Sequence, residues 1–111
     1  MTFSGFDVVK VPFPFSDKRA KKVRPALVIS NESEFNTPAG HSVLAMITSA
    51  THTPWPLDVS IKSLKEAGLP VESIVRMKLF TLDHRLIIET LGRLAAGDQT
   101  AVSKALQRLV N

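Results

Sequence analysis

The chain has 111 residues, the size of one domain, and we expect residues 1–111 to form a single domain. It contains no cysteine, no apolar run near the ~20 residues that span a membrane and no signal-peptide pattern. We therefore expect a cytoplasmic protein without disulfides, cysteine-zinc sites, thiol nucleophiles or membrane spans. The formal net charge is +4, and the whole excess lies in residues 1–30, which hold six of the 14 Lys and Arg residues but only two of the ten Asp and Glu residues.

The first predicted strand covers residues 6–11, where three valines supply β-branched side chains. Pro12 and Pro14 follow and cannot donate to a strand ladder, so we expect the strand to end there or to lie at a sheet edge. The charged run at residues 16–22 then predicts a loop.

Two short apolar runs, residues 26–30 and 42–48, predict strands that are buried on both faces. Asparagine, proline and glycine in residues 31–41 predict a loop between them. A turn is expected over residues 49–56, where Trp55 lies between two prolines.

Apolar and polar residues alternate over residues 57–61, which is the period of a half-buried strand. A brief helix or turn is expected over 62–68, ending at Gly68, and another strand over 73–80. The pattern of residues 84–93 fits either a strand or a helical turn.

A C-terminal helix is predicted, with Asp98 as its N-cap, because apolar residues then recur at helical spacing. These are Ala101, Val102, Ala105, Leu106, Leu109 and Val110, with Lys104 and Arg108 on the outer face. Five or six short strands and one helix predict a mainly β fold, either a small twisted barrel or a sandwich. Periodicity does not choose between the two.

Several classes of site lack their sequence patterns. His41, His52 and His84 are scattered without metal-ligand spacing, so no metal site is expected. The chain has no glycine-rich phosphate loop, no G-x-S-x-G elbow and no paired carboxylates in apolar surroundings. We expect no cofactor.

The basic segment ends at Arg24, at the predicted junction of a loop and a buried strand. Pro25 favours extended backbone there, and a planar guanidinium suits a phosphate; the alternative is an arginine that covers the rim of the barrel. Thr48 ends the next buried strand, and it is either a positioned functional hydroxyl or a local backbone partner. The basic residues as a group indicate a polyanionic partner or a solvated loop.

Six blocks, in order along nearly the whole chain, resemble the MazF/PemK toxins of bacterial toxin–antitoxin modules. The block with arginine, proline, alanine, leucine and valine is the most specific. They are residues 6–17 (FDVVKVPFPFSD), 23–30 (VRPALVIS), 47–49 (ITS), 73–76 (SIVR), 78–83 (KLFTLD) and 88–94 (IETLGRL).

The resemblance implies an SH3-like barrel of five to six strands with a C-terminal helix, similar to MazF and CcdB, that assembles as a homodimer. It implies a metal-independent endoribonuclease that cleaves single-stranded RNA, usually mRNA, and a cognate antitoxin protein as partner. The family's catalytic arginine and threonine fall on Arg24 and Thr48.

RNA contacts are expected from the basic loop and from the turn after Thr48. The expected residues are Lys18, Arg19, Lys21, Lys22, Ser49 and Trp55. Trp55 either stacks on an unpaired base or seals one end of the barrel. His52, four residues beyond Thr48, either takes part in proton transfer or is an exposed loop histidine.

Two other functions fit the same fold class: a CcdB-like toxin that inhibits DNA gyrase, and a non-catalytic nucleic-acid-binding barrel. Arg24 with Thr48 favours the ribonuclease. The sequence departs from many relatives at Phe6, which separates Gly5 from Asp7, and at Met77 and Lys78, where several relatives carry a polar amide or acid. The second difference bears on RNA specificity.

Overall fold

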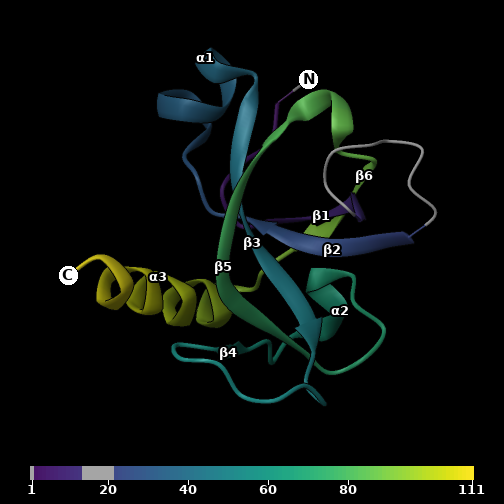
Figure 1. Cartoon of the computed structure of the whole chain (residues 1–111), viewed down its shortest axis with the longest axis vertical. Coiled ribbons are helices and arrows are strands. Elements are labelled where there is room, and N and C mark those ends of the chain that lie inside the picture. Colours follow the sequence, from purple (N-terminus) through teal and green to yellow (C-terminus); the bar gives the residue numbers. More distant parts are fainter. Residues whose placement is uncertain (1, 14–21) are drawn as a thin grey trace.

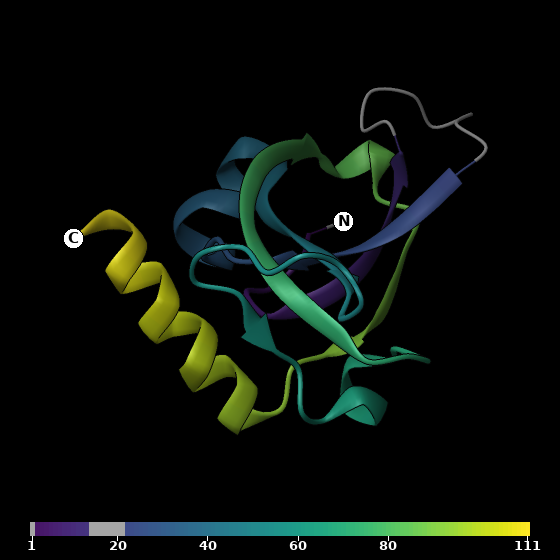
Figure 2. The ribbon, with the colours of Figure 1, turned by 60° about the horizontal axis from the view of Figure 1, so that its bottom comes forward.

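The computed structural model describes residues 2–13 and 22–111. Within them, six strands form one antiparallel sheet in the order β4-β5-β3-β2-β1-β6, and the C-terminal helix α3 (Ala96–Val110) lies beside it (Figure 1). The strands are β1 (Asp7–Phe13), β2 (Lys22–Val28), β3 (His41–Ser49), β4 (Val59–Ser60), β5 (Ser73–Asp83) and β6 (Glu89–Arg93). The sheet curls on itself (Figure 2), which confirms a mainly β, barrel-type fold with a C-terminal helix.

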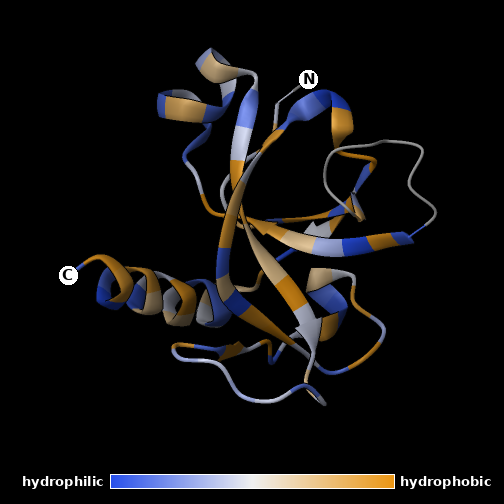
Figure 3. Cartoon of the chain, viewed as in Figure 1, coloured by the Kyte–Doolittle hydropathy of each residue, from blue (hydrophilic) through white to orange (hydrophobic). Residues whose placement is uncertain are grey.

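Both faces of the sheet carry clusters of buried apolar side chains. Successive residues of a strand point to opposite sides, so one strand contributes side chains to both clusters. On the helix-covered face, α3 contributes Val102 and Ala105 to a cluster with strand residues that include Val8, Leu27 and Ala45. The opposite face carries a second cluster: Phe3, Val9, Val11, Ala26, Val28, Leu44, Leu82 and Ile87. Figure 3 shows β2 hydrophobic where it pairs inside the sheet and partly hydrophilic where it begins.

The segment predicted as a loop over residues 31–41 contains two short helices instead. A π-helical turn, η1 (Glu32–Asn36), is capped by the Asn31 side chain, which accepts from the Glu34 N–H at 2.9 Å. It continues into α1 (Thr37–Ala39). The fully buried Asn36 amide donates to the carbonyls of Phe3 and Ser30, so polar contacts order this segment where the sequence shows no periodicity.

The strand predicted over residues 57–61 is reduced to the two residues of β4. Leu57 has a φ of 65°, a left-handed conformation that an extended strand does not accommodate. The expected stop at Gly68 is confirmed. Gly68 follows α2 (Leu64–Ala67) with a φ of 71°, and a Cβ there would lie 2.1 Å from the Leu91 carbonyl oxygen.

Asp98 does not cap α3, which begins at Ala96 after Ala95 as its N-cap. Its buried carboxylate instead accepts from the N–H groups of Lys62 at 3.1 Å and Ser63 at 3.0 Å, at the start of α2. The prediction was wrong because a carboxylate satisfies whichever unpaired N–H groups the fold brings to it, including those of another helix.

The ambiguous residues 84–93 contain both predicted alternatives. A 3₁₀ turn, η2 (His84–Leu86), is followed by β6. Asp83 caps the turn by accepting from the Arg85 N–H at 2.8 Å. Within the described part of the chain, none of the helices combines the length and the apolar run that crossing a bilayer requires.

Candidate functional site

Arg24 and Thr48 lie on neighbouring strands and on the same face of the sheet. Ala26 of β2 pairs with Met46 of β3, and Val28 pairs with Leu44. The ladder between the two strands ends at Ala26 and Met46. Arg24 comes two residues before Ala26 and Thr48 two residues after Met46, so the alternation along each strand puts both side chains on the face opposite the helix. Arg24 is the third residue of β2, so the predicted loop–strand junction at this position was wrong; the strand begins earlier, at Lys22.

The Arg24 side chain is held against an aromatic ring and lacks a full set of hydrogen bonds. Its guanidinium carbon lies 4.7 Å from the centroid of the Phe13 ring, a cation–π contact. Its Nε is buried and has no hydrogen-bond partner among residues 2–13 and 22–111. A buried donor without a partner costs free energy, and such groups are found at sites that bind a ligand or substrate.

A tight turn follows Thr48 and returns His52 to it. The His52 N–H donates to the Ser49 carbonyl at 3.2 Å, and His52 Nδ1 lies 3.1 Å from Thr48 Oγ1. The Ser49 hydroxyl lies 3.0 Å from Thr51 Oγ1 and accepts from the Thr51 N–H at 3.3 Å. Ser49 therefore builds the turn that brings His52 and Thr48 together.

Trp55 lies against two cations of β5 and is 43% exposed. The Lys78 Nζ is 4.7 Å from the ring centroid and the guanidinium carbon of Arg76 is 5.8 Å away. Such an exposed ring does not seal the interior of the barrel. The two cations place a positive potential beside an accessible aromatic surface, which is a combination that suits single-stranded nucleic acid.

Arg76 anchors the Trp55 loop through Asp58. Its Nε and Nη2 donate to the two Asp58 oxygens at 3.2 and 3.0 Å, and Nη2 also donates to the Thr53 carbonyl at 2.7 Å. The Trp55 N–H donates to the same carboxylate at 2.8 Å. Burial by itself would raise the pKa of Asp58, but the hydrogen bonds from Arg76 and the Trp55 N–H outweigh it and leave that pKa below its ordinary value.

A bulge in β5 explains where the two residues that depart from the family pattern lie. Met46 pairs with Arg76, whereas the preceding Ala45 pairs with Leu79, so Met77 and Lys78 are extra residues in β5. Met77 is buried in the helix-side cluster and Lys78 is exposed beside Trp55.

Of the basic residues predicted to contact RNA phosphates in the loop, the structure describes Lys22 alone. Lys22 is the first residue of β2, exposed and paired with Phe13 of β1. Lys18, Arg19 and Lys21 lie outside the described residues.

Sequence reasoning did not identify Asp58 and Arg76 as parts of the site. A signal for Arg76 is present, because it lies among the apolar residues Ile74, Val75 and Met77, and a charge buried in such a run is normally paired. Its partner is 18 residues away, and no pattern in the sequence connects the two.

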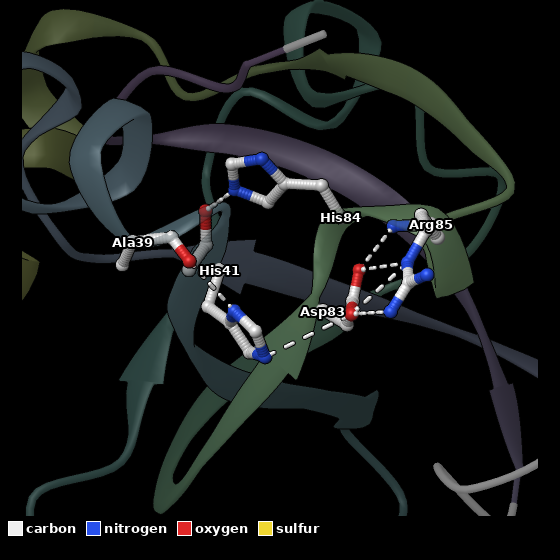
Figure 4. Close-up of polar contacts among 6 residues, drawn as sticks. Ala39, His41, Asp83, His84 and Arg85 are labelled. Carbon is white, nitrogen blue, oxygen red and sulfur yellow. Dashed lines mark hydrogen bonds and ion pairs between the residues drawn. The ribbon is translucent and has the colours of Figure 1, made fainter.

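Polar side chains also gather where β3 begins and β5 ends (Figure 4). His41 pairs with Asp83 in the ladder, and its Nε2 lies 3.9 Å from the carboxylate. Hydrogen bonds from the Arg85 side chain and N–H hold the pKa of Asp83 well below its ordinary value. His84 Nε2 lies 2.8 Å from Ser42 Oγ. His41, Asp83, His84 and Arg85 line a hollow of about 900 Å³. The contacts of His41 with Asp83 and of Ser42 with His84 hold the start of β3 against the end of β5.

Within residues 2–13 and 22–111, no group of three or more histidine, aspartate or glutamate side chains is arranged to hold a metal ion.

A family model described as PemK-like, MazF-like toxin of type II toxin–antitoxin systems matches residues 5–110. No curated protein is significantly similar to this chain in sequence. Among solved structures, a MazE–MazF complex from Deinococcus radiodurans has a TM-score of 0.74 at 23% identity, covering 100% of this chain and 97% of that one. An endoribonuclease in complex with its cognate antitoxin from mycobacterial species has 0.74 at 17%, covering 97% and 94%. Mycobacterium tuberculosis toxin MazF-mt6 has 0.69 at 20%, covering 92% and 93%.

Proposed function

This chain belongs to the PemK-like, MazF-like toxin family of type II toxin–antitoxin systems, and on that premise we propose that it is a metal-independent, sequence-specific endoribonuclease. Its substrate is single-stranded mRNA. A ribose 2′-hydroxyl attacks the adjacent phosphorus, the bond from phosphorus to the 5′-oxygen breaks, and the products end in a 2′,3′-cyclic phosphate and a 5′-hydroxyl.

The observation that carries the proposal is that β2 and β3 are paired neighbours, with Ala26 opposite Met46. Arg24 and Thr48, each two residues from this pair, share the face opposite the helix, which supports their joint action on one phosphate. Negative charge grows on the non-bridging phosphate oxygens in the transition state. Arg24 offers a permanently charged, planar group to those oxygens, and the Thr48 hydroxyl adds a hydrogen bond. The buried Arg24 Nε supports this role, because among the described residues the fold makes no hydrogen bond with it.

RNA binding involves residues beyond this pair. Lys18, Arg19, Lys21 and Lys22 contact phosphates, and contacts of this kind position the strand without reading its bases. Trp55 stacks on an unpaired base, with Lys78 and Arg76 beside it, and Ser49 lies near the cleaved bond.

We also propose that the protein works in the cytoplasm as a homodimer and is blocked by a cognate antitoxin protein. The similarity to a MazE–MazF complex and to an endoribonuclease bound to its antitoxin supports the second partner. Large apolar side chains on the surface of the single chain support both interfaces, since burial of such side chains stabilises association. They are Val23, Phe35, Val71, Leu79, Ile88, Leu109 and Val110.

The proposal is tested by incubating the purified protein with single-stranded RNA in EDTA and mapping the new RNA ends. We expect cleavage at a short motif with cyclic-phosphate and 5′-hydroxyl ends. Binding without turnover would instead identify a non-catalytic RNA-binding barrel. Intact RNA together with altered DNA supercoiling would identify a gyrase inhibitor.

A further inference from the structure

His52 is folded back onto the end of β3 by the turn that follows Thr48. Its backbone N–H donates to the Ser49 carbonyl at 3.2 Å, which closes the turn. Its ring Nδ1 lies 3.1 Å from that same carbonyl oxygen and 3.1 Å from Thr48 Oγ1. The imidazole therefore meets the candidate catalytic hydroxyl through one defined nitrogen.

The Ser49 carbonyl decides which atom carries the hydrogen in this contact. A carbonyl oxygen can only accept a hydrogen bond, so a ring nitrogen within 3.1 Å of it is in place to donate. Nδ1–H is then shared between the Ser49 carbonyl and Thr48 Oγ1. Because Thr48 Oγ1 accepts in this arrangement, its own hydrogen remains available to a second acceptor.

We propose that His52 is a positioning residue for the ribonuclease reaction, whose Nδ1–H holds the Thr48 hydroxyl so that Thr48 donates its hydrogen to a phosphate oxygen of RNA. This rests on the proposed function. A free threonine hydroxyl rotates among several orientations. A fixed donor to Oγ1 excludes the orientations in which the hydroxyl would donate to an acceptor of the protein and not to the phosphate.

The alternative role for His52 is to accept a proton from the ribose hydroxyl, and the two roles differ in their dependence on pH. Nδ1–H is present both in the neutral ring with its hydrogen on Nδ1 and in the doubly protonated ring. Positioning therefore continues when the ring gains a proton, whereas proton acceptance stops. The charged groups on adjoining elements are Arg24 on β2, Arg76 and Lys78 on β5, and Asp58 before β4, and they stay the same in every His52 variant.

Three substitutions at this position separate the roles. In His52→Asn the amide nitrogen is as many bonds from Cα as Nδ1, so the donor to Thr48 is kept. His52→Gln moves the amide nitrogen to the distance of Nε2, and His52→Ala removes it. We expect His52→Asn to retain kcat for a short single-stranded RNA, and His52→Gln and His52→Ala to lose about tenfold in kcat with KM little changed. The matched control is His41→Asn, in the hollow of Figure 4, which should cleave like wild type.

Two further measurements test whether His52 acts through Thr48. In a Thr48→Val background, where the hydroxyl is already absent, His52→Ala should lower kcat no further. Wild type and His52→Asn should have the same pH–rate profile. If the pH–rate profile of wild type has a limb that is missing from the profile of His52→Asn, His52 transfers a proton and does not position Thr48. The same conclusion follows if His52→Asn is as inactive as His52→Ala.

Failure of this proposal can be told apart from failure of the proposed function. Wild-type protein that leaves RNA intact overturns the endoribonuclease itself. Wild-type protein that cleaves while His52→Ala cleaves equally well overturns only the role of His52. Imidazole nitrogen chemical shifts of the RNA-free protein provide a readout without activity: we expect the hydrogen on Nδ1 of His52, and a neutral ring with its hydrogen on Nε2 would overturn the geometry on which the proposal stands.

Discussion

Arg76 and Asp58 form a two-pronged ion pair in which Nε and Nη2 of the arginine donate to both carboxylate oxygens, at 3.2 and 3.0 Å. Their side chains are only 11% and 15% exposed. The same carboxylate accepts the Trp55 N–H at 2.8 Å, and Arg76 Nη2 also donates to the Thr53 carbonyl at 2.7 Å. One ion pair therefore holds the loop that carries the tryptophan at both Thr53 and Asp58. Since Arg76 stands opposite Met46, two residues before Thr48, this loop is fixed beside the candidate catalytic strand.

Substitution of Asp58 tests this anchor. Asp58→Asn should change the fluorescence of the protein, because the chain has a single tryptophan and the substitution weakens the acceptor of its N–H. RNA affinity should fall with it, while circular dichroism should keep the spectrum of the folded sheet. Asp83→Asn, at the far end of β5, is the control and should leave the tryptophan emission unchanged; equal spectra for wild type and Asp58→Asn would count against the anchor.

Arg24→Ala should separate activity from stability. We expect cleavage to fall by about 10²–10³-fold, the usual effect of removing a group that stabilises transition-state charge. The melting temperature should fall only slightly: within the described residues Arg24 Nε has no hydrogen bond to lose, and the cation–π contact with Phe13 that is lost contributes about 0.5–1 kcal/mol. Arg108→Ala, an exposed arginine of α3, removes the same charge and should cleave normally. Full activity in Arg24→Ala would rule out the proposed centre.

Trp55→Ala should weaken binding of single-stranded RNA by about 1–3 kcal/mol, the contribution of one base stacked on an aromatic ring. Stability should change little, since the ring is 43% exposed. Binding is measured by titration with an uncleavable RNA that carries a 2′-deoxy linkage at the cut site. Phe35→Ala, in η1 and 38% exposed, is the matched aromatic control. Equal affinity of Trp55→Ala and wild type would remove Trp55 from the interface.

Asp83→Asn should lower the melting temperature near neutral pH, because it removes a carboxylate that Arg85 and the adjacent N–H stabilise in its charged form. The folded-state pKa of Asp83 is depressed, so its stabilisation is present above the unfolded-state pKa and is lost as the pH falls below it. The gap in melting temperature between wild type and variant should therefore narrow below about pH 4. Glu72→Gln serves as the exposed control, and a gap that stays constant down to pH ~2 would contradict the assignment.

Asp98→Ala should destabilise the protein by about 1–3 kcal/mol, because the N–H groups of Lys62 and Ser63 lose their acceptor in a partly buried position. Asp98→Asn keeps an acceptor oxygen and should cost less. Denaturant unfolding gives both values. Gln107→Ala, exposed on the same helix, should unfold like wild type. If Asp98→Ala proves as stable as wild type, the carboxylate does not support the start of α2.

The sequence by itself determined the parts of this protein that depend on local patterns. The strand at β3, the stop at Gly68 and the C-terminal helix follow from period and from glycine geometry, which neighbouring residues settle among themselves. Arg24 and Thr48 could be selected because each stands at an abrupt change from apolar to polar residues, and because their blocks resemble a known family.

Only the tertiary structure decided which of these residues meet. Four contacts join residues that are far apart in the chain. They are the pairing of β2 with β3, the Arg76–Asp58 ion pair, the contact of His41 with Asp83, and the hydrogen bonds that Asp98 accepts at the start of α2. A hydrogen-bonding side chain carries no local signal of its partner, since any acceptor that the fold brings within reach satisfies it. His52 belongs to both groups: its spacing from Thr48 is visible in the sequence, but the turn alone determines which of its two ring nitrogens faces the hydroxyl.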